Sequence, residues 1–295
     1  MGRAPPLSPM EIFETEIYRH YFQVAGFRPM ERETQKATVD GLLERYDAFF
    51  FDAFGTLYNR KHYVYPSACD MFHKIRRRGK QIRLVTNAAS QSMQRLMSDL
   101  DAMDLHFDRS EIFSSGDLFA QKSHSLHIRE CFYIGHDSGR EYLAASGIAV
   151  RDDPADNAVA ISAVPDSDAA FDRALDILKR PHAKLFVLNP DAWAPRINAP
   201  RDPVSGAFAH KLFKATGCTV SYYGKPFPEI FENAKRSIPR GSRIVMIGDT
   251  LATDIAGALN TGIDAALIPG RNMIPEKIPE DERSLRVRPT YYLDV

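Results

Sequence analysis

Short apolar runs that stop at a polar residue recur along this chain of 295 residues. Mainly apolar runs of this length are typical of strands that are buried on both faces of a parallel sheet. The three clearest runs lie at 48–51, 82–86 and 243–248, and they lead into Asp52, Asn87 and Asp249. The pattern therefore predicts buried strands that each present a polar side chain at one end.

Stretches with helical spacing separate these runs. In one of them, Ala68, Met71, Phe72 and Ile75 share one face. Helices are expected at 9–24, 67–78, 90–103, 118–127, 140–146, 169–179, 230–236 and 253–260, and further strands at 107–115, 131–135, 158–164, 184–188, 265–268 and 290–293, the last as an edge strand. Residues 28–46 are polar and have a helical composition. Because strands and helices alternate, the sequence predicts right-handed crossovers, a parallel sheet and the α/β class.

Composition and charge exclude several classes of protein. The 38 basic and 38 acidic residues cancel, so no overall field favours nucleic acid or an anionic membrane. Cys69, Cys131 and Cys218 show neither zinc-site nor disulfide spacing. No stretch reaches the roughly 18 apolar residues that a membrane span requires, and residues 1–30 lack the apolar centre of a signal peptide. We therefore expect a soluble, cytoplasmic protein that binds neither nucleic acid nor membrane.

Acidic residues follow two of the predicted strands. Asp52 and Asp249 end their strands, and Asp254 follows in the sequence GDTLATD. Because the carboxyl ends of parallel strands meet at one sheet edge, these side chains are expected to lie together. A few hard oxygen ligands are what Mg²⁺ selects. The sequence therefore predicts a magnesium site, whereas the alternative is that these residues only cap the helices that follow.

Donors suited to phosphoryl oxygens are predicted at the same edge. Thr86 and Asn87 end a strand and offer a hydroxyl, an amide and the first N–H groups of the next helix. Lys225 lies in GKPFPEIF, where Gly224 permits a close approach. An ammonium held there neutralises an attacking carboxylate and a transferring group together.

Four segments carry a family resemblance. DAFGTLYN, LVTNAAS, GKPFPEIF and VMIGDTLATDIAGALNTGIDAALI resemble the four ordered motifs of the haloacid dehalogenase (HAD) superfamily, in its class IIA branch of 4-nitrophenylphosphatase-like and nucleotidase-like proteins. The resemblance implies a Rossmann-like core with a smaller α/β cap between the second and third motifs. We expect the core at 41–127 and 224–295, the cap at 128–223, and a helical extension at 1–40 that lies outside the resemblance.

The resemblance also implies roles for the motif residues. Asp52 would attack phosphorus to give an aspartyl-phosphate, while Thr86, Asn87 and Lys225 hold the phosphoryl group. A small phosphorylated metabolite is the expected substrate.

The implied Mg²⁺ ligands come from the first and last motifs. They are Asp52, the backbone carbonyl of Phe54 and Asp249, with Asp254 orienting that shell. Gly55 and Thr56 are expected to contact the substrate.

One residue departs from the family pattern. Phe54 stands where most phosphatases of the superfamily carry the Asp that protonates the leaving group. Three hypotheses remain: a slow phosphatase or one with an acid from elsewhere, a haloacid dehalogenase-like hydrolase, and a phosphate- and metal-binding regulatory protein without turnover. The GDTLATD metal motif disfavours dehalogenation, because haloacid dehalogenases use no Mg²⁺.

The expected cap contributes one loop of interest. In NPDAWAPRINAPRD, the residues Asp191, Trp193 and Arg196 cluster, and similar segments in relatives approach the active site. We expect these residues to contact the substrate, with Trp193 as a loop anchor or as a stacking partner. Relatives often dimerise through the cap, so a homodimer is expected.

Overall fold

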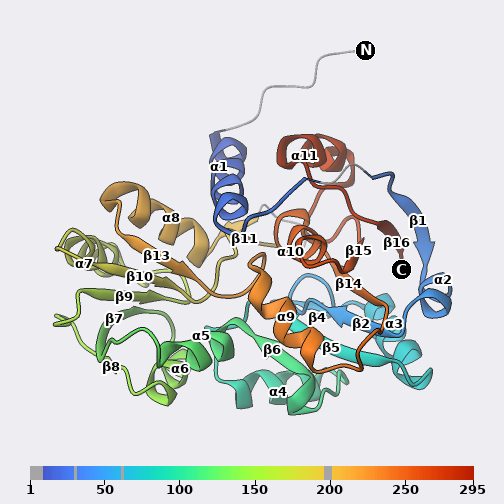
Figure 1. Cartoon of the computed structure of the whole chain (residues 1–295), viewed down its shortest axis with the longest axis horizontal. Coiled ribbons are helices and arrows are strands. Elements are labelled where there is room, and N and C mark those ends of the chain that lie inside the picture. Colours follow the sequence, from blue (N-terminus) through green and yellow to red (C-terminus); the bar gives the residue numbers. More distant parts are fainter. Residues whose placement is uncertain (1–8, 30–31, 61–62, 196–200) are drawn as a thin grey trace.

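Seven parallel strands form the larger of two main sheets, in the order β1-β16-β15-β14-β2-β5-β6 (Figure 1). The structure is a computed structural model that describes residues 9–29, 32–60, 63–195 and 201–295. The strands are β1 (Gln35–Thr38), β16 (Tyr291–Asp294), β15 (Asp264–Leu267), β14 (Ile244–Gly248), β2 (Ala48–Phe51), β5 (Gln81–Thr86) and β6 (Ile112–Ser114). The carboxyl ends of β2, β5 and β14 therefore meet at one edge.

Both faces of this sheet are covered by helices, as its uninterrupted apolar strands require. Successive residues of β2 show the alternation: Phe49 and Phe51 pack on one side and Phe50 on the other. The first side is covered by α2 (Val39–Arg45), α3 (Pro66–Arg77) and α4 (Met93–Ala102). The second is covered by α5 (Ser115–Ser123), α9 (Pro228–Arg236), α10 (Ala256–Asn260) and α11 (Ile278–Leu285).

A second parallel sheet of five strands lies within one continuous stretch of chain. Its order is β13-β10-β9-β7-β8, with β7 (Glu130–Ile134), β8 (Ala149–Val150), β9 (Ala158–Ile161), β10 (Lys184–Val187) and β13 (Thr219–Tyr222). One face packs on α7 (Asp168–Leu178) and α8 (Ser205–Thr216). The other, with α6 (Glu141–Ala145), joins the core cluster beneath the larger sheet. The two sheets thus share a hydrophobic core.

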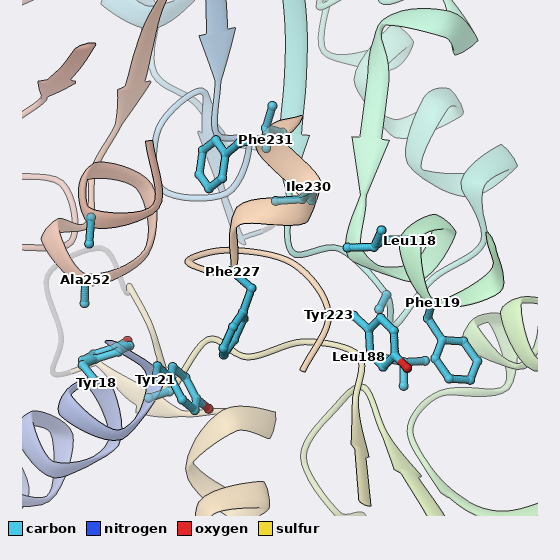
Figure 2. Packing of buried hydrophobic residues seen from close by; sticks show 14 of the residues in the cluster. Tyr18, Tyr21, Leu118, Phe119, Leu188, Tyr223, Phe227, Ile230, Phe231 and Ala252 are labelled. Atoms are coloured by element: carbon cyan, nitrogen blue, oxygen red, sulfur yellow. The ribbon is translucent and has the colours of Figure 1, made fainter. Parts of the chain in front are cut away.

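The α1 helix (Pro9–Val24) lies between α8 and α11 (Figure 1). Its inward side chains belong to the shared core; in Figure 2, Tyr18 lies near Ala252 and Tyr21 near Phe227. Tyr21 and Phe227 have ring centroids 5.4 Å apart. Two short antiparallel ribbons complete the described strands: β3 (Tyr58–Asn59) with β4 (Tyr63–Val64), and β11 (Trp193–Ala194) with β12 (Asp202–Pro203).

The predicted α/β class with a parallel core sheet is confirmed, and several details differ. Residues 35–38 form β1 instead of continuing a helix, because an exposed edge strand needs no apolar run. The final strand is not an edge strand, since β1 pairs outside it. The predicted helix at 118–127 begins earlier, at Ser115, where Ser114 accepts a cap hydrogen bond from Asp117. The helices α8 and α11 and the strand β13 were not predicted.

None of the described helices combines the length and the apolar content that crossing a bilayer requires.

Candidate active site

The first motif folds into a strand followed by a tight turn. Asp52 extends β2 by one more ladder bond, from its N–H to the carbonyl of Ile247 at 3.0 Å. The chain then turns at Gly55, whose φ is +98°. A Cβ at Gly55 would lie 1.9 Å from Asp249 Oδ2, so only glycine lets the turn approach that carboxylate.

The last motif brings two more carboxylates to the same place. Asp249 follows β14, and a π-helical turn at Leu251–Ile255 carries Asp254 back toward the strand end. Asp254 Oδ2 accepts hydrogen bonds from the backbone N–H groups of Asp249 and Thr250, both at 3.1 Å. These bonds fix the carboxylate of Asp254, and π turns of this kind occur often at functional sites.

Lys225 lies among these carboxylates. It follows β13 in a loop, and only 1% of the residue is exposed. Its Nζ lies 2.5 Å from Asp52 Oδ1 and 2.8 Å from Asp254 Oδ1. A buried ammonium between two carboxylates is held tightly, since leaving either charge unpaired would be costly.

The charges of the cluster do not balance, because three carboxylates surround one ammonium. Burial raises the pKa of Asp52 to about 7. The charge of Lys225 acts to lower this pKa, whereas the charge of Asp254 acts to raise it. Burial and the charges of Asp52 and Asp254 raise the pKa of Asp249 well above its usual value. Burial alone would lower the pKa of Lys225, but the nearby carboxylates raise it. Three carboxyl groups thus share one ammonium, and a bound cation would favour their ionised forms.

The donor set fits a hard divalent cation. Ligand atoms of Asp52, Asp249 and Asp254 all lie within 4.8 Å of one another. Asp249 Oδ2 is buried, and among the described residues no hydrogen-bond donor is paired with it. An orphaned carboxylate oxygen beside two others is the environment that Mg²⁺ or a similar ion occupies.

The second motif links the strand end to the Lys225 loop. Thr86 ends β5, and its hydroxyl accepts from the N–H of Ala88 at 3.3 Å. Asn87 Oδ1 accepts from the Lys225 N–H at 2.7 Å, and Asn87 Nδ2 donates to the Lys225 carbonyl at 3.0 Å. Gly224 has φ +101°, and a Cβ there would lie 2.3 Å from Asn87 Oδ1. Asn87 therefore holds Lys225 through both backbone groups.

A cavity of about 330 Å³ opens above this cluster, with Asp52, Thr86, Asn87, Lys225, Asp249 and Asp254 in its lining. Asp191 and Trp193, from the stretch that includes β11, line it as well. Asp191 Oδ1 accepts from Asn87 Nδ2 at 2.9 Å. Arg196 lies outside the described residues. Phe54 also lines the cavity, with its ring edge-to-face against Tyr58 at 5.9 Å.

Gly55 and Thr56 lie against the carboxylates of the cluster. Thr56 is fully buried, and its hydroxyl donates to Asp52 Oδ2 at 3.1 Å. Neither residue belongs to the described lining of the cavity. Thr56 and Gly55 therefore support Asp52 and Asp249 from behind, and substrate contacts by them stay a prediction.

Sequence reasoning missed other members of the site. Asn272 Nδ2 donates to Thr250 Oγ1 at 2.7 Å, which in turn donates to Asp249 Oδ1 at 3.1 Å. Asn272 lies in the loop beyond the end of β15, so the strand-end rule does not find it. Tyr18 of α1 also lines the cavity, and no signal in the sequence distinguishes it from the apolar face of its helix.

A parallel α/β fold that gathers carboxylates and a buried lysine at one sheet edge defines a class of hydrolases. Two family models match the chain: a haloacid dehalogenase-like hydrolase model at residues 49–149 and a HAD-hydrolase-like model at residues 222–294. The chain therefore belongs to the haloacid dehalogenase-like hydrolases.

Individual relatives agree with the predicted branch of that superfamily. The 5'-nucleotidase YutF of Bacillus subtilis is 24% identical over 262 residues, which cover 85% of this chain and 96% of the relative. The 4-nitrophenylphosphatase of Schizosaccharomyces pombe is 24% identical, over 85% of this chain and 92% of the relative. The resemblance to 4-nitrophenylphosphatase-like and nucleotidase-like proteins is thus confirmed.

Solved structures share the fold. A possible sugar phosphatase of the HAD superfamily from Cytophaga hutchinsonii superposes with a TM-score of 0.79 at 25% identity, over 89% of this chain and 98% of that one. The 4-nitrophenylphosphatase of Thermotoga maritima gives a TM-score of 0.69 at 20% identity, over 86% and 95% of the two chains.

Proposed function

We propose that this chain is a Mg²⁺-dependent phosphohydrolase that cleaves a small phosphate monoester through an aspartyl-phosphate on Asp52. The observation that carries the proposal is the position of Lys225 Nζ, 2.5 Å from Asp52 and 2.8 Å from Asp254, beside the unpaired carboxylate oxygen of Asp249. Relatives named as phosphatases and nucleotidases support the same chemistry.

Asp52, Asp249 and Asp254 would hold the metal, with the Phe54 carbonyl as a predicted further ligand. When bound, Mg²⁺ supplies positive charge that stabilises the oxygens of the transferring phosphoryl group. The orphaned Asp249 oxygen supports this assignment, because a buried carboxylate without a partner is costly.

In the first step, an Asp52 carboxylate oxygen attacks phosphorus while the bond from phosphorus to the leaving oxygen breaks. Lys225, Thr86 and Asn87 bind the phosphoryl oxygens and oppose their negative charge. In the second step, water attacks phosphorus, which frees Asp52 and inorganic phosphate. The 330 Å³ cavity lies at the small end of the range for ligand sites, about 300–1,000 Å³, and favours a small leaving group.

The test is 4-nitrophenyl phosphate hydrolysis with Mg²⁺ and with EDTA, by the wild type and by Asp52→Asn. We expect Mg²⁺-dependent release of 4-nitrophenolate that Asp52→Asn lowers by at least about 10³-fold. The exposed Asp166→Asn serves as control and should match the wild type.

Other outcomes would select the remaining hypotheses. Absence of Mg²⁺-dependent and Asp52-dependent release would remove the phosphatase proposal and leave a phosphate-binding, regulatory protein. Halide release from a 2-haloacid that EDTA does not affect would instead identify a dehalogenase.

We further propose that residues 128–223 form a cap over a core at 41–127 and 224–295. The support is that all strands of the smaller sheet fall between Glu130 and Tyr222. Of the predicted extension at 1–40, β1 pairs with β16 of the larger sheet, which supports including Gln35–Thr38 in the core; the boundary itself stays a prediction. The predicted homodimer stays a prediction, which light scattering after size-exclusion chromatography would test.

A further inference from the structure

A proton donor for the leaving oxygen is needed when the leaving group is a poor one, as in an alkyl phosphate. Phe54, two residues after Asp52, has no proton to give. The described residues that line the cavity and titrate, apart from the Asp52 cluster, are Tyr18, Tyr58, Arg60, Asp99 and Asp191. One of them has the position and the ionisation that the step requires.

Four of these groups are unsuitable. Asp99 is paired with Arg95 at 2.9 Å, so its carboxylate is already engaged by a guanidinium. Arg60 pairs with Asp202 at 2.6 Å and stays charged at any physiological pH. Burial raises the pKa of both tyrosines above the usual range, so that they are weak proton donors.

Asp191 is held at the phosphoryl end of the cavity. It follows β10, and its N–H donates to Asn189 Oδ1 at 3.0 Å, which fixes the turn. Its Oδ1 accepts from Asn87 Nδ2 at 2.9 Å, and Asn87 binds both backbone groups of Lys225. The side chain keeps partial exposure where it lines the cavity. The Asn87 side chain therefore links the Asp191 carboxyl group to Lys225, where the substrate would bind.

The ionisation of Asp191 suits a proton donor near neutral pH. Removal from water raises its pKa to about 6, although Lys225 and the Asn87 hydrogen bond act in the opposite direction; Asp254 raises it further. Tyr18 of α1 lines the same cavity, and the charge of Asp191 helps to raise the pKa of its hydroxyl. General acids work best when their pKa lies near the operating pH.

The α1 helix holds the segment that carries Asp191. Phe13 packs edge-to-face on Trp193, with ring centroids 6.1 Å apart. Glu14 binds Arg201 through two hydrogen bonds of 2.8 and 2.6 Å. Two side chains that follow Asp191 in the chain, Trp193 and Arg201, are thus fixed by a helix that neither family model includes.

From this geometry we infer that Asp191 is the general acid that replaces the group missing at Phe54. The inference rests on the proposed phosphatase function. The Asp191 proton passes to the leaving oxygen as the bond from phosphorus to that oxygen breaks. The Asp191 carboxylate then takes a proton from the attacking water while the bond from phosphorus to Asp52 breaks. Inorganic phosphate leaves, and Asp191 is protonated again.

The experiment compares glycerol phosphate, which has a poor leaving group, with 4-nitrophenyl phosphate, which has a good one. For Asp191→Asn, we expect kcat/KM to fall about 10²–10⁴-fold on glycerol phosphate and less than about tenfold on 4-nitrophenyl phosphate. Rapid mixing with 4-nitrophenyl phosphate should show a burst approaching one 4-nitrophenolate per chain, because water activation in the second step is slowed.

The controls separate this role from a structural one. Asp99→Asn, which alters another carboxyl group of the cavity, should change kcat/KM for both esters by the same small factor. Phe54→Asp should restore glycerol phosphate turnover in the Asp191→Asn background, and raise it less than about tenfold in the wild type. If Asp191→Asn lowered kcat/KM equally on both esters and showed neither a burst nor a rescue by Phe54→Asp, the role of Asp191 would be overturned and the proposed function would stand. An inactive wild type would overturn the proposed function as well.

Discussion

The two sides of the candidate active-site cavity are built in different ways. On one side, Asp52 and Asp249 continue strands of the seven-stranded sheet, and backbone hydrogen bonds fix them. On the other side, the Asp191 segment is positioned by side-chain contacts, among them Asn87 and the α1 helix. The family models cover the first side and omit α1 and residues 150–221. We infer that the sheet edge sets the class of reaction. The opposite wall of the cavity, which carries the Asp191 segment, is free to change its proton donor and the substrate that it accepts.

Lys225→Met should have the largest effect on the sheet-edge side of the cavity. The change leaves three buried carboxylates without their ammonium, so the free energy of unfolding should fall by about 3–5 kcal/mol in EDTA. Turnover of 4-nitrophenyl phosphate should fall about 10²–10³-fold, as for loss of one preorganised charge. Urea unfolding and steady-state kinetics measure the two effects.

A matched variant is Lys235→Met, which removes a partly exposed ammonium 3.0 Å from Glu232. Exposed pairs of this kind contribute at most about 1 kcal/mol. If both variants lost the same stability, the carboxylate cluster would not depend on Lys225.

The same side should show an unusual pH dependence without metal. The folded, metal-free protein keeps the Asp52 proton up to about pH 7, whereas the unfolded chain loses it near 3.8. The stabilisation from this group is therefore complete below pH 4 and is lost as the pH rises to 7. We expect the free energy of unfolding in EDTA to fall by about 1 kcal/mol per pH unit between pH 5 and 7.

Urea unfolding of two further samples tests whether the Asp52 cluster causes this pH dependence. Asp52→Asn should reduce the slope, although Asp249 and Asp191, whose pKa values are also raised, act in the same direction. Saturating Mg²⁺ should reverse it, because metal binding requires ionised carboxylates. A slope unchanged by both would place its cause outside the cluster.

The sequence predicted the sheet-edge side far better than the wall. Asp52, Asn87 and Asp249 end apolar runs, and parallel strands bring such ends together whatever the loops do. Lys225 and Asp254 do not end strands, and only the short segments GKPFPEIF and GDTLATD in which they lie pointed to them. Nothing in residues 9–24 distinguishes a packing helix from one that supplies Tyr18 to a catalytic cavity. That placement depends on long-range contacts with Arg201 and Trp193, which local periodicity does not encode.

The smallest predicted effect concerns the wall and its attachment to α1. Glu14→Ala removes both hydrogen bonds to Arg201 and should lower the free energy of unfolding by about 1–2 kcal/mol, since both partners are partly buried. Because the Asp191 segment loses one support, kcat/KM on glycerol phosphate should fall a few-fold, while 4-nitrophenyl phosphate hydrolysis stays near the wild-type rate. Lys214→Ala removes an exposed α8 partner of Glu16, which lies on α1 like Glu14. This variant should hydrolyse both esters at the wild-type rate. If Glu14→Ala weakened both reactions equally, α1 would stabilise the whole site and not the wall in particular.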